Sequence, residues 1–301
     1  MRLAVGTYSG NATDNRAITG LGFQTSWVLV KRTDATGDGV YSRSSTMPTN
    51  NSSHFTAANN LVTDAIKTLD SDGFTIGVNG AVNASGISYA YAGFGTDANS
   101  QLTAGSYSGN DTDSRAITGV GFAPDMVYIV PGTAQSRVWR PSTFAGDNSL
   151  VLPSGTAANL IQTLDSDGFT LGNDARVNVS PNIYHYVAFR LVTNGLETNS
   201  YTGNGVDARS ISIGFQPIFT MIQDSTTTTN ICVGRFGVSG DSSGAMSDAA
   251  WTTDIIQAFN SNGFEVGLAA TVNTDTDTYH AFSALDNPLA GGRSGLQSKI
   301  W

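Results

Sequence analysis

Hydrophobic and polar residues follow one pattern three times along the chain. A segment that alternates polar and apolar residues until a glycine interrupts it begins at Arg16, Arg115 and Arg209. An apolar run follows in each copy, at 27–30, 126–130 and 218–222. Alternation predicts a half-buried strand, and a short apolar run is typical of a strand covered on both faces. The pattern therefore predicts three similar sets of β-strands.

A tight hairpin is the clearest element of each set. In the first copy, Asp70-Ser71-Asp72-Gly73 separates two alternating segments, 66–69 and 74–77. Asp-Gly suits such a turn because glycine, and to a lesser extent Asp or Asn, adopts positive φ. The turn recurs around Gly168 and, with Asn in place of both Asp residues, around Gly263.

The three hairpin glycines are spaced by 95 residues. A solenoid repeat has about 20 to 50 residues, whereas about 100 residues make one small domain. We expect three copies of one domain, at 1–98, 99–193 and 194–285, followed by a tail at 286–301. Short strands joined by close turns predict that each copy is an antiparallel β-sandwich, with a jelly roll as one possible form.

Two regions are less regular. Residues 57–69 are the strongest helix candidate, but the corresponding segment of the third copy is only weakly similar, so helix is expected to be scarce. The segments that differ most among the copies are rich in Gly, Ser, Thr, Asn and Pro and are expected to form long surface loops, which commonly carry recognition; they lie at 32–60, 131–158 and 223–250.

Composition narrows the class of protein. The net charge is −9, with only 13% charged residues, which argues against binding to a nucleic-acid backbone. A single cysteine, Cys232, excludes an intrachain disulfide framework. The N-terminal residues lack an apolar signal core, and no apolar stretch is long enough to cross a membrane. We expect synthesis in a cytoplasm and no membrane insertion.

Metal binding and catalysis are not indicated. The Asp-Ser-Asp-Gly segment resembles the start of a calcium loop, but no Glu completes it and the third copy has no Asp there. Of the three histidines, His185 and His280 occupy equivalent positions, where the first copy has Ala90, and His54 has no counterpart. A catalytic or metal-binding histidine would not be lost from one copy of an active repeat. His185 is expected to face solvent or a neighbouring copy. No cofactor motif is present.

An Asp-x-Arg pair occurs in every copy. Residues two apart lie on one face of a strand, so the pair favours a structural clamp in which Arg binds a carboxylate or loop carbonyls; a polar ligand contact is the alternative. The pairs are Asp14 and Arg16, Asp113 and Arg115, and Asp207 and Arg209.

Tryptophans are candidate platforms for sugar rings, because an indole offers a flat apolar face and a polar edge. Trp27 lies in an apolar run and is expected in the core. Trp139 lies in a variable segment and is the best candidate for a glycan contact, with Arg137 and Arg140 beside it; packing under the loop is the alternative. The terminal Trp301, with Arg293 and Lys299, makes the tail a candidate docking segment.

Several recurring motifs together resemble a repeated module of tailed-bacteriophage virion proteins. They are Tyr-[Ser/Thr]-Gly-Asn, Asp-x-Arg, Gly-Phe-x-Pro, Asp-Ser-Asp-Gly-Phe-x-Leu-Gly and Val-Asn. Such modules are similar to concanavalin-A-like lectin sandwiches and occur in fibre, spike and decoration proteins. The first copy departs by lacking the Pro and the third by lacking the Asp turn. The resemblance implies a structural or adhesive role and transfers no catalytic residue.

Two functions follow as hypotheses. The first is a non-enzymatic virion structural protein, exposed on the particle, that contributes to assembly and host attachment. Its expected partners are other virion proteins, copies of itself and host-surface glycans. The second is a tandem carbohydrate-binding or glycan-processing protein.

Overall fold

The computed structural model of the chain describes residues 1–34, 38–96, 101–240 and 242–286. Three repeats of one six-stranded and one three-stranded antiparallel sheet contain nearly all of the regular secondary structure of this part. We name the repeats module 1, module 2 and module 3, using the predicted ranges 1–98, 99–193 and 194–285. The prediction of an all-β chain built from three antiparallel β-sandwiches is confirmed.

Each module places its strands in the same order. In module 1 the six-stranded sheet runs β1 (Arg2–Ser9), β9 (Ser88–Gly95), β3 (Thr25–Arg32), β4 (Tyr41–Ser44), β5 (Asn51–His54) and β6 (Val62–Thr63). Its three-stranded sheet runs β2 (Arg16–Thr19), β8 (Gly73–Ile76) and β7 (Ile66–Asp70), and a short helical turn, α1 (Gly80–Asn83), follows β8.

Modules 2 and 3 repeat this arrangement. The six-stranded sheet of module 2 runs β10 (Leu102–Ser108), β18 (Ile183–Phe189), β12 (Met126–Pro131), β13 (Val138–Pro141), β14 (Asn148–Val151) and β15 (Thr156–Ala158), and its small sheet runs β11 (Arg115–Thr118), β17 (Gly168–Leu171) and β16 (Ile161–Asp165). In module 3 the six-stranded sheet runs β19 (Leu196–Thr202), β27 (Thr278–Ala284), β21 (Phe219–Asp224), β22 (Val233–Phe236), β23 (Ser243–Ala245) and β24 (Trp251–Thr252). Its small sheet runs β20 (Arg209–Ser212), β26 (Gly263–Val266) and β25 (Ile256–Asn260), and the short helix α2 (Ala270–Asn273) follows β26.

The predicted hairpins are confirmed as β7–β8, β16–β17 and β25–β26. Their glycines are fixed by a close approach as well as by positive φ. A Cβ atom at Gly73 would lie 2.0 Å from the carbonyl oxygen of Ile18, on the neighbouring strand β2, and the same collision would occur at Gly168 and Gly263. The third copy therefore keeps the glycine although it has lost the acidic residues.

Each apolar run contributes side chains to two hydrophobic cores, one on each face of its sheet. In β3, Trp27 and Leu29 point to one face of the sheet, whereas Val28 and Val30 point to the other. Val28 and Val30 pack under the small sheet of module 1 in a core that belongs to that module alone. Corresponding cores lie inside modules 2 and 3. The prediction of strands covered on both faces is confirmed.

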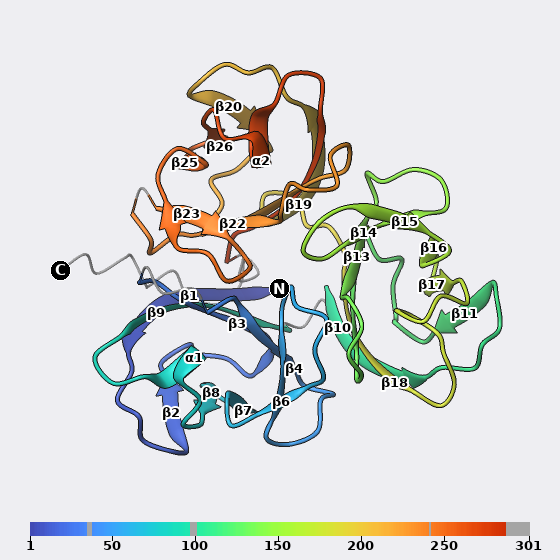
Figure 1. Cartoon of the computed structure of the whole chain (residues 1–301), viewed down its shortest axis with the longest axis horizontal. Coiled ribbons are helices and arrows are strands. Elements are labelled where there is room, and N and C mark those ends of the chain that lie inside the picture. Colours follow the sequence, from blue (N-terminus) through green and yellow to red (C-terminus); the bar gives the residue numbers. More distant parts are fainter. Residues whose placement is uncertain (35–37, 97–100, 241, 287–301) are drawn as a thin grey trace.

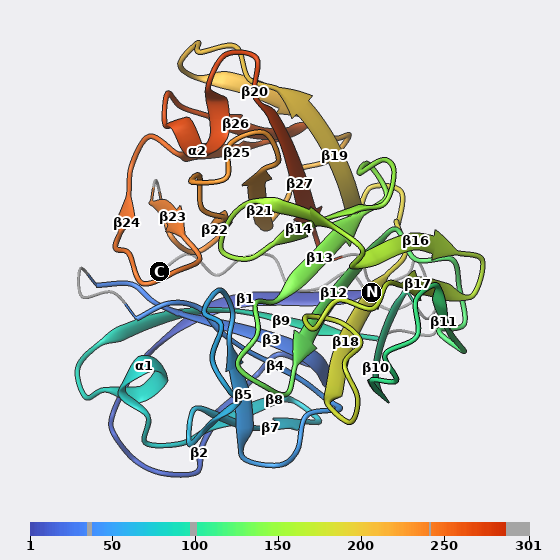
Figure 2. The same cartoon turned by 45° about the vertical axis from the view of Figure 1, so that its right-hand side comes forward.

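The second core is shared by all three modules, which surround a common centre (Figure 1). Phe94 of module 1 lies there with its ring centroid 5.6 Å from Phe189 of module 2 and 5.6 Å from Phe219 of module 3. Phe189 in turn lies 5.1 Å from Phe282 of module 3. In the turned view, β1 and β9 form the layer of module 1 that faces the other two modules (Figure 2). The small sheets lie on the outside.

The variable segments are not the surface loops that composition suggested. They form the strands β4–β5, β13–β14 and β22–β23, and most residues of these strands are buried. Arg137 and His54 are bound by residues of a neighbouring module, which composition does not reveal, whereas Arg43, Arg140 and Arg235 bind carbonyl oxygens of their own module. Residues 57–69 are not helical; they hold β6 and β7. Among the described residues, no helix is long and apolar enough to span a membrane.

Candidate functional site

The three residues proposed to contact glycans lie inside the molecule, which corrects the expectation of an exposed loop. Trp139 is fully buried, and its Nε1 donates to Oε1 of Gln223 in module 3 at 2.7 Å. Arg137 is also fully buried, and its Nε donates to Ser53 Oγ of module 1 at 2.8 Å. Both side chains therefore join modules instead of meeting solvent.

Arg140 is one of three equivalent buried arginines whose role as loop clamps was not predicted from the sequence. Its guanidinium donates to the backbone oxygens of Phe144, Gly146, Asn148 and Ile161. Arg43 and Arg235 occupy the same position in the other modules and also bind loop carbonyls. Burial lowers the pKa of Arg43 to about 10. The available signal was an Arg that recurs on the strand directly after each apolar run, on β4, β13 and β22.

Within each Asp-x-Arg pair, the Asp and the Arg bind different partners and not each other. Arg115 donates to the carbonyl oxygen of Ser108 at 2.5 Å and to Asn178 Oδ1 at 2.9 Å, and its guanidinium lies over the Tyr107 ring. Asp113 instead accepts from Gln162 Nε2 at 2.9 Å. The structure thus places the arginine as a clamp on a loop carbonyl and gives the aspartate a different partner.

The other two copies repeat this arrangement. Arg16 donates to the carbonyl oxygen of Ser9, and Arg209 donates to that of Thr202. Asp14 lies against Lys67 Nζ at 2.9 Å, and Asp207 accepts from Gln257 Nε2 at 2.9 Å.

The acidic hairpins use their carboxylates within the fold. Asp72 accepts from the backbone N–H groups of Gly20 and Gly22 at 3.0 and 2.6 Å. Asp167 makes the same pair of bonds in module 2, to Gly119 and Gly121. Groups of three or more potential metal ligands do not occur among the residues that the structure describes. The terminal residues Arg293, Lys299 and Trp301 lie outside the described residues.

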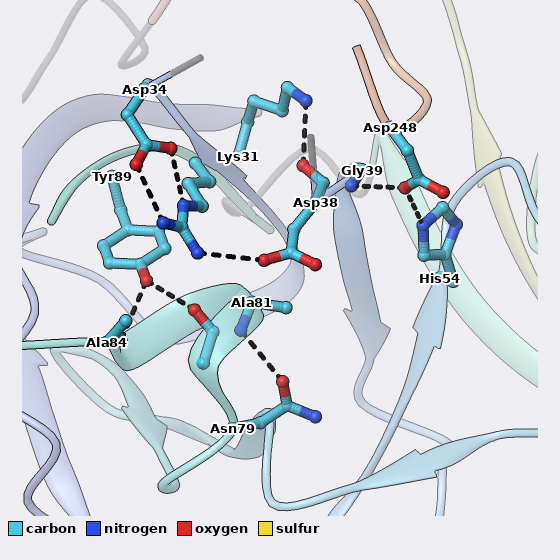
Figure 3. A network of polar contacts seen from close by, with 12 residues as sticks. Lys31, Asp34, Asp38, Gly39, His54, Asn79, Ala81, Ala84, Tyr89 and Asp248 are labelled. Carbon is cyan, nitrogen blue, oxygen red and sulfur yellow. Dashed lines mark hydrogen bonds and ion pairs between the residues drawn. The ribbon is translucent and has the colours of Figure 1, made fainter. Parts of the chain in front are cut away.

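His54 belongs to a polar network that joins module 3 to module 1 (Figure 3). Asp248 Oδ1 accepts from Gly39 N at 2.7 Å and lies 2.8 Å from His54 Nε2. The other ring nitrogen, Nδ1, accepts from Ala57 N at 3.0 Å. Nε2 therefore carries the proton, and both nitrogens are engaged. Burial is the main cause that lowers the pKa of His54, so a neutral imidazole with no free nitrogen occupies this position.

Lys31 is the second unexpected member of this network. Its Nζ donates to the backbone oxygens of Asp38 in module 1 and of Ser247 and Ala249 in module 3, at 2.9 to 3.1 Å. Burial lowers the pKa of its ammonium to about 8. A lysine that directly continues the apolar run of β3 was the signal for this contact in the sequence.

His185 and His280 face neighbouring modules. His185 Nδ1 lies 3.1 Å from Thr46 Oγ1 of module 1, and His280 Nδ1 lies 3.0 Å from Thr143 Oγ1 of module 2. Burial lowers the pKa of both imidazoles to about 4. They are neutral, buried interface residues at physiological pH.

A pocket of about 300 Å³ opens where module 3 meets module 1. Module 1 contributes hydroxyl-bearing residues, and module 3 contributes the rest of the lining; the lining residues are Thr7, Thr33, Ser88, Val238, Ser239, Ser242 and Trp251. The indole of Trp251 stacks on Phe236 with ring centroids 5.7 Å apart, so its position is fixed. Trp251, and not Trp139, is the tryptophan that lines a pocket here.

A second pocket of about 440 Å³ lies in module 2, beside Asp125, Arg140 and Ser142. Its polar groups already have partners. Asp125 Oδ2 accepts from Leu191 N, Arg140 binds loop carbonyls, and Ser142 Oγ lies 3.1 Å from Thr198 Oγ1. This pocket therefore leaves few polar groups for a ligand, and the pocket between modules 3 and 1 is the better candidate site.

Comparison with protein families gives a match for module 1. Residues 3–98 match a family model described as a domain of unknown function (DUF7483). The matched segment spans the strands of module 1, and modules 2 and 3 repeat its sheet order. No curated protein matches the chain. Module 1 is thus similar to a domain of unknown function, and the chain carries that architecture three times.

Proposed function

We propose that the chain is a non-enzymatic bacteriophage virion structural protein, a component of a fibre, spike or decoration layer that contributes to particle assembly and host-surface attachment. One observation supports this most. Three similar modules share one apolar core and direct their small sheets outward, which produces a body with approximate threefold symmetry. Closed symmetric assembly is the rule for multi-subunit particles, and a body of this kind suits a threefold position.

The chemistry of the titratable groups is consistent with a binding role. General base catalysis needs a side chain with a pKa near the working pH and a free nitrogen or oxygen. His54 has both ring nitrogens engaged, and His185 and His280 are buried neutral. The hairpin carboxylates accept backbone hydrogen bonds. These groups stabilise the modules and their interfaces.

The assembly role is tested on particles. An antibody against the purified chain should label particles sedimented from a lysate of the producing cells, at many copies per particle. Residues 287–301 are the proposed docking segment. Their deletion should leave the chain folded and remove it from the particles. A chain that stays in the supernatant while the particles are complete contradicts the virion role, and a truncated chain that assembles at wild-type copy number contradicts the docking role of the tail.

A carbohydrate-binding protein is the second candidate function. The observation that favours it is the hydroxyl-rich pocket with Trp251 in its wall. Glycan processing is separable from glycan binding by product analysis. Release of oligosaccharides from a polysaccharide by the purified chain, abolished by replacement of a single Asp, would contradict the non-enzymatic proposal.

A further inference from the structure

The pocket between modules 3 and 1 lies where the approximate threefold symmetry of the chain is broken. On the face of each large sheet that meets the preceding module, one residue on the second strand of the sheet, β9, β18 or β27, occupies the same register. It is His185 in module 2, opposite Ser106, and His280 in module 3, opposite Ser200. In module 1 it is Ala90, opposite Thr7. Two of the three interfaces are therefore filled by an imidazole, and the third is not.

At the third interface, the threonine that contacts the histidine is also replaced. Thr46 and Thr143 lie three residues after the buried arginines Arg43 and Arg140, and each contacts a histidine of the next module. The equivalent position after Arg235 is Val238, which is 40% exposed. The third interface thus lacks both partners of the bridge.

The side chain opposite Ala90 is engaged by backbone groups of both modules. Lys31 lies opposite Ala90 on β3, but its Nζ is bound to the carbonyl oxygens of Asp38, Ser247 and Ala249. The interface is closed on that side by these bonds and by Asp248. The pocket of about 300 Å³ lies beside this position, with Thr7, the strand partner of Ala90, and Val238 in its lining.

The lining of the pocket defines the class of ligand. The hydroxyls of Thr7, Ser88 and Ser242 have no hydrogen-bond partner among the residues that the structure describes. Each of them can donate and accept. Trp251 adds an apolar aromatic wall held in place by Phe236. No charged side chain among the described residues lines the pocket.

This combination fits a neutral sugar better than other small ligands. A pyranose presents hydroxyls to hydroxyl partners and C–H groups to an aromatic ring. A phosphate, carboxylate or cation would need a charged partner in the lining. Ligand pockets begin at about 300 Å³, so this pocket suits one monosaccharide residue of a longer chain.

We propose that the pocket between modules 3 and 1 is a binding subsite for one neutral monosaccharide residue of a cell-surface polysaccharide. The inference rests on the proposed attachment function and gives it a location and a ligand class. One subsite per chain makes a single contact weak, and repeated display on a particle converts weak contacts into firm attachment.

The test uses the full chain and a symmetry-restoring variant. Saturation-transfer NMR is recorded with glucose, galactose, mannose, N-acetylglucosamine and rhamnose, and with glucuronate and sialic acid as charged comparators. We expect transfer to at least one neutral sugar and to neither acid. The double variant Ala90→His with Val238→Thr introduces at this interface the pair that fills the other two. It should keep the thermal stability of the wild type and weaken sugar binding at least tenfold.

A matched pair of single variants provides an independent test in case the double variant misfolds. Ser88 of module 1 and Ile183 of module 2 occupy the same register, and Ile183 is 46% exposed. The variant Ser88→Ile therefore places in module 1 a residue that module 2 already has. It should weaken binding several-fold. Thr278→Ile makes the same change in module 3, away from the pocket, and should leave binding unchanged.

The outcomes separate this inference from the proposed function. Binding that persists in both Ala90→His/Val238→Thr and Ser88→Ile overturns the subsite, as does transfer only to the acidic sugars. A chain that is found on particles but binds none of the neutral sugars also overturns the subsite and leaves the virion role standing. A chain absent from particles that binds a sugar through this pocket supports the subsite and overturns the virion role.

Discussion

Thr46 Oγ1 of module 1 lies 3.1 Å from His185 Nδ1 of module 2, and this contact, with its repeat between Thr143 and His280, links the modules in series. Both histidines are buried and neutral, with the pKa held near 4 by burial. Because the unfolded chain has the ordinary histidine pKa of about 6.5, the unfolded state binds more protons than the folded state between these two values.

The first prediction follows from that difference. A histidine whose folded pKa is lowered contributes stability that is fully present above about pH 6.5 and is lost as the pH falls through 4. We expect protonation of each histidine to lower the free energy of unfolding by about 2 to 4 kcal/mol between pH 7 and pH 4. Urea unfolding across this range measures the loss.

A double variant, His185→Gln with His280→Gln, isolates the effect. Glutamine can still meet Thr46 and Thr143, but it does not titrate. The difference in stability between the wild type and this variant should therefore shrink or reverse as the pH falls. Parallel pH profiles for the two proteins would show that these histidines do not titrate as the structure requires.

The second prediction concerns the Asp-x-Arg pair of module 2. Replacing Arg115 by Ala removes the Arg115 donor from the Ser108 carbonyl and leaves Asn178 Oδ1 with Asn110 N as its donor, which should cost about 1 to 3 kcal/mol. Replacing Asp113 by Ala removes only its exposed contact with Gln162 and should cost less than about 0.5 kcal/mol.

The double variant of these two residues tests their independence. Residues that do not contact each other show additive effects. A coupling energy near zero between Arg115 and Asp113 is expected from thermal unfolding. A coupling above about 1 kcal/mol would restore the direct ion pair that the sequence suggested.

The third prediction concerns the acidic hairpins. Because Asp167 accepts the N–H groups of Gly119 and Gly121, its carboxylate is engaged by the backbone. Chelation with EDTA should leave the melting temperature unchanged. The variant Asp167→Ala should lose about 1 to 3 kcal/mol whether or not calcium is present. A melting temperature that falls with EDTA and recovers with calcium would contradict this prediction and show that the hairpins bind calcium.

Local patterns in the sequence predicted the hairpin and the apolar strand of each module, but not β4, β5 and β6, which lie in segments expected to be loop or helix. Alternation and the Asp-Gly turn located the hairpin at Gly73, and the apolar run located β3, because these signals depend on neighbouring residues and on burial that any sandwich provides. The glycine at 73 was predicted for its conformation, and the collision with Ile18 adds a second reason that only the paired strand reveals.

Interactions between modules could not be predicted from these patterns. Trp139 and Arg137 stand in a polar segment and looked exposed, but Gln223 and Ser53 of other modules cover them. In the sequence, Ala90 at the position of His185 and His280 argues only against a catalytic or metal site. Its position at an interface became clear only when module 3 was seen against module 1.

We expect the three modules to unfold as one cooperative unit because they share an apolar core. Phe94 contacts Trp27 of its own module, Phe189 of module 2 and Phe219 of module 3. Truncating it should cost about 3 to 5 kcal/mol. Because the ring serves all three modules, this loss should affect the whole described chain and not module 1 alone.

Differential scanning calorimetry of the wild type and of Phe94→Ala tests this claim most directly. We expect one transition in each protein, with the calorimetric enthalpy close to the van't Hoff enthalpy, and a lower midpoint for the variant. Separate transitions for the three modules, or a variant in which only one of several transitions moves, would contradict the shared core.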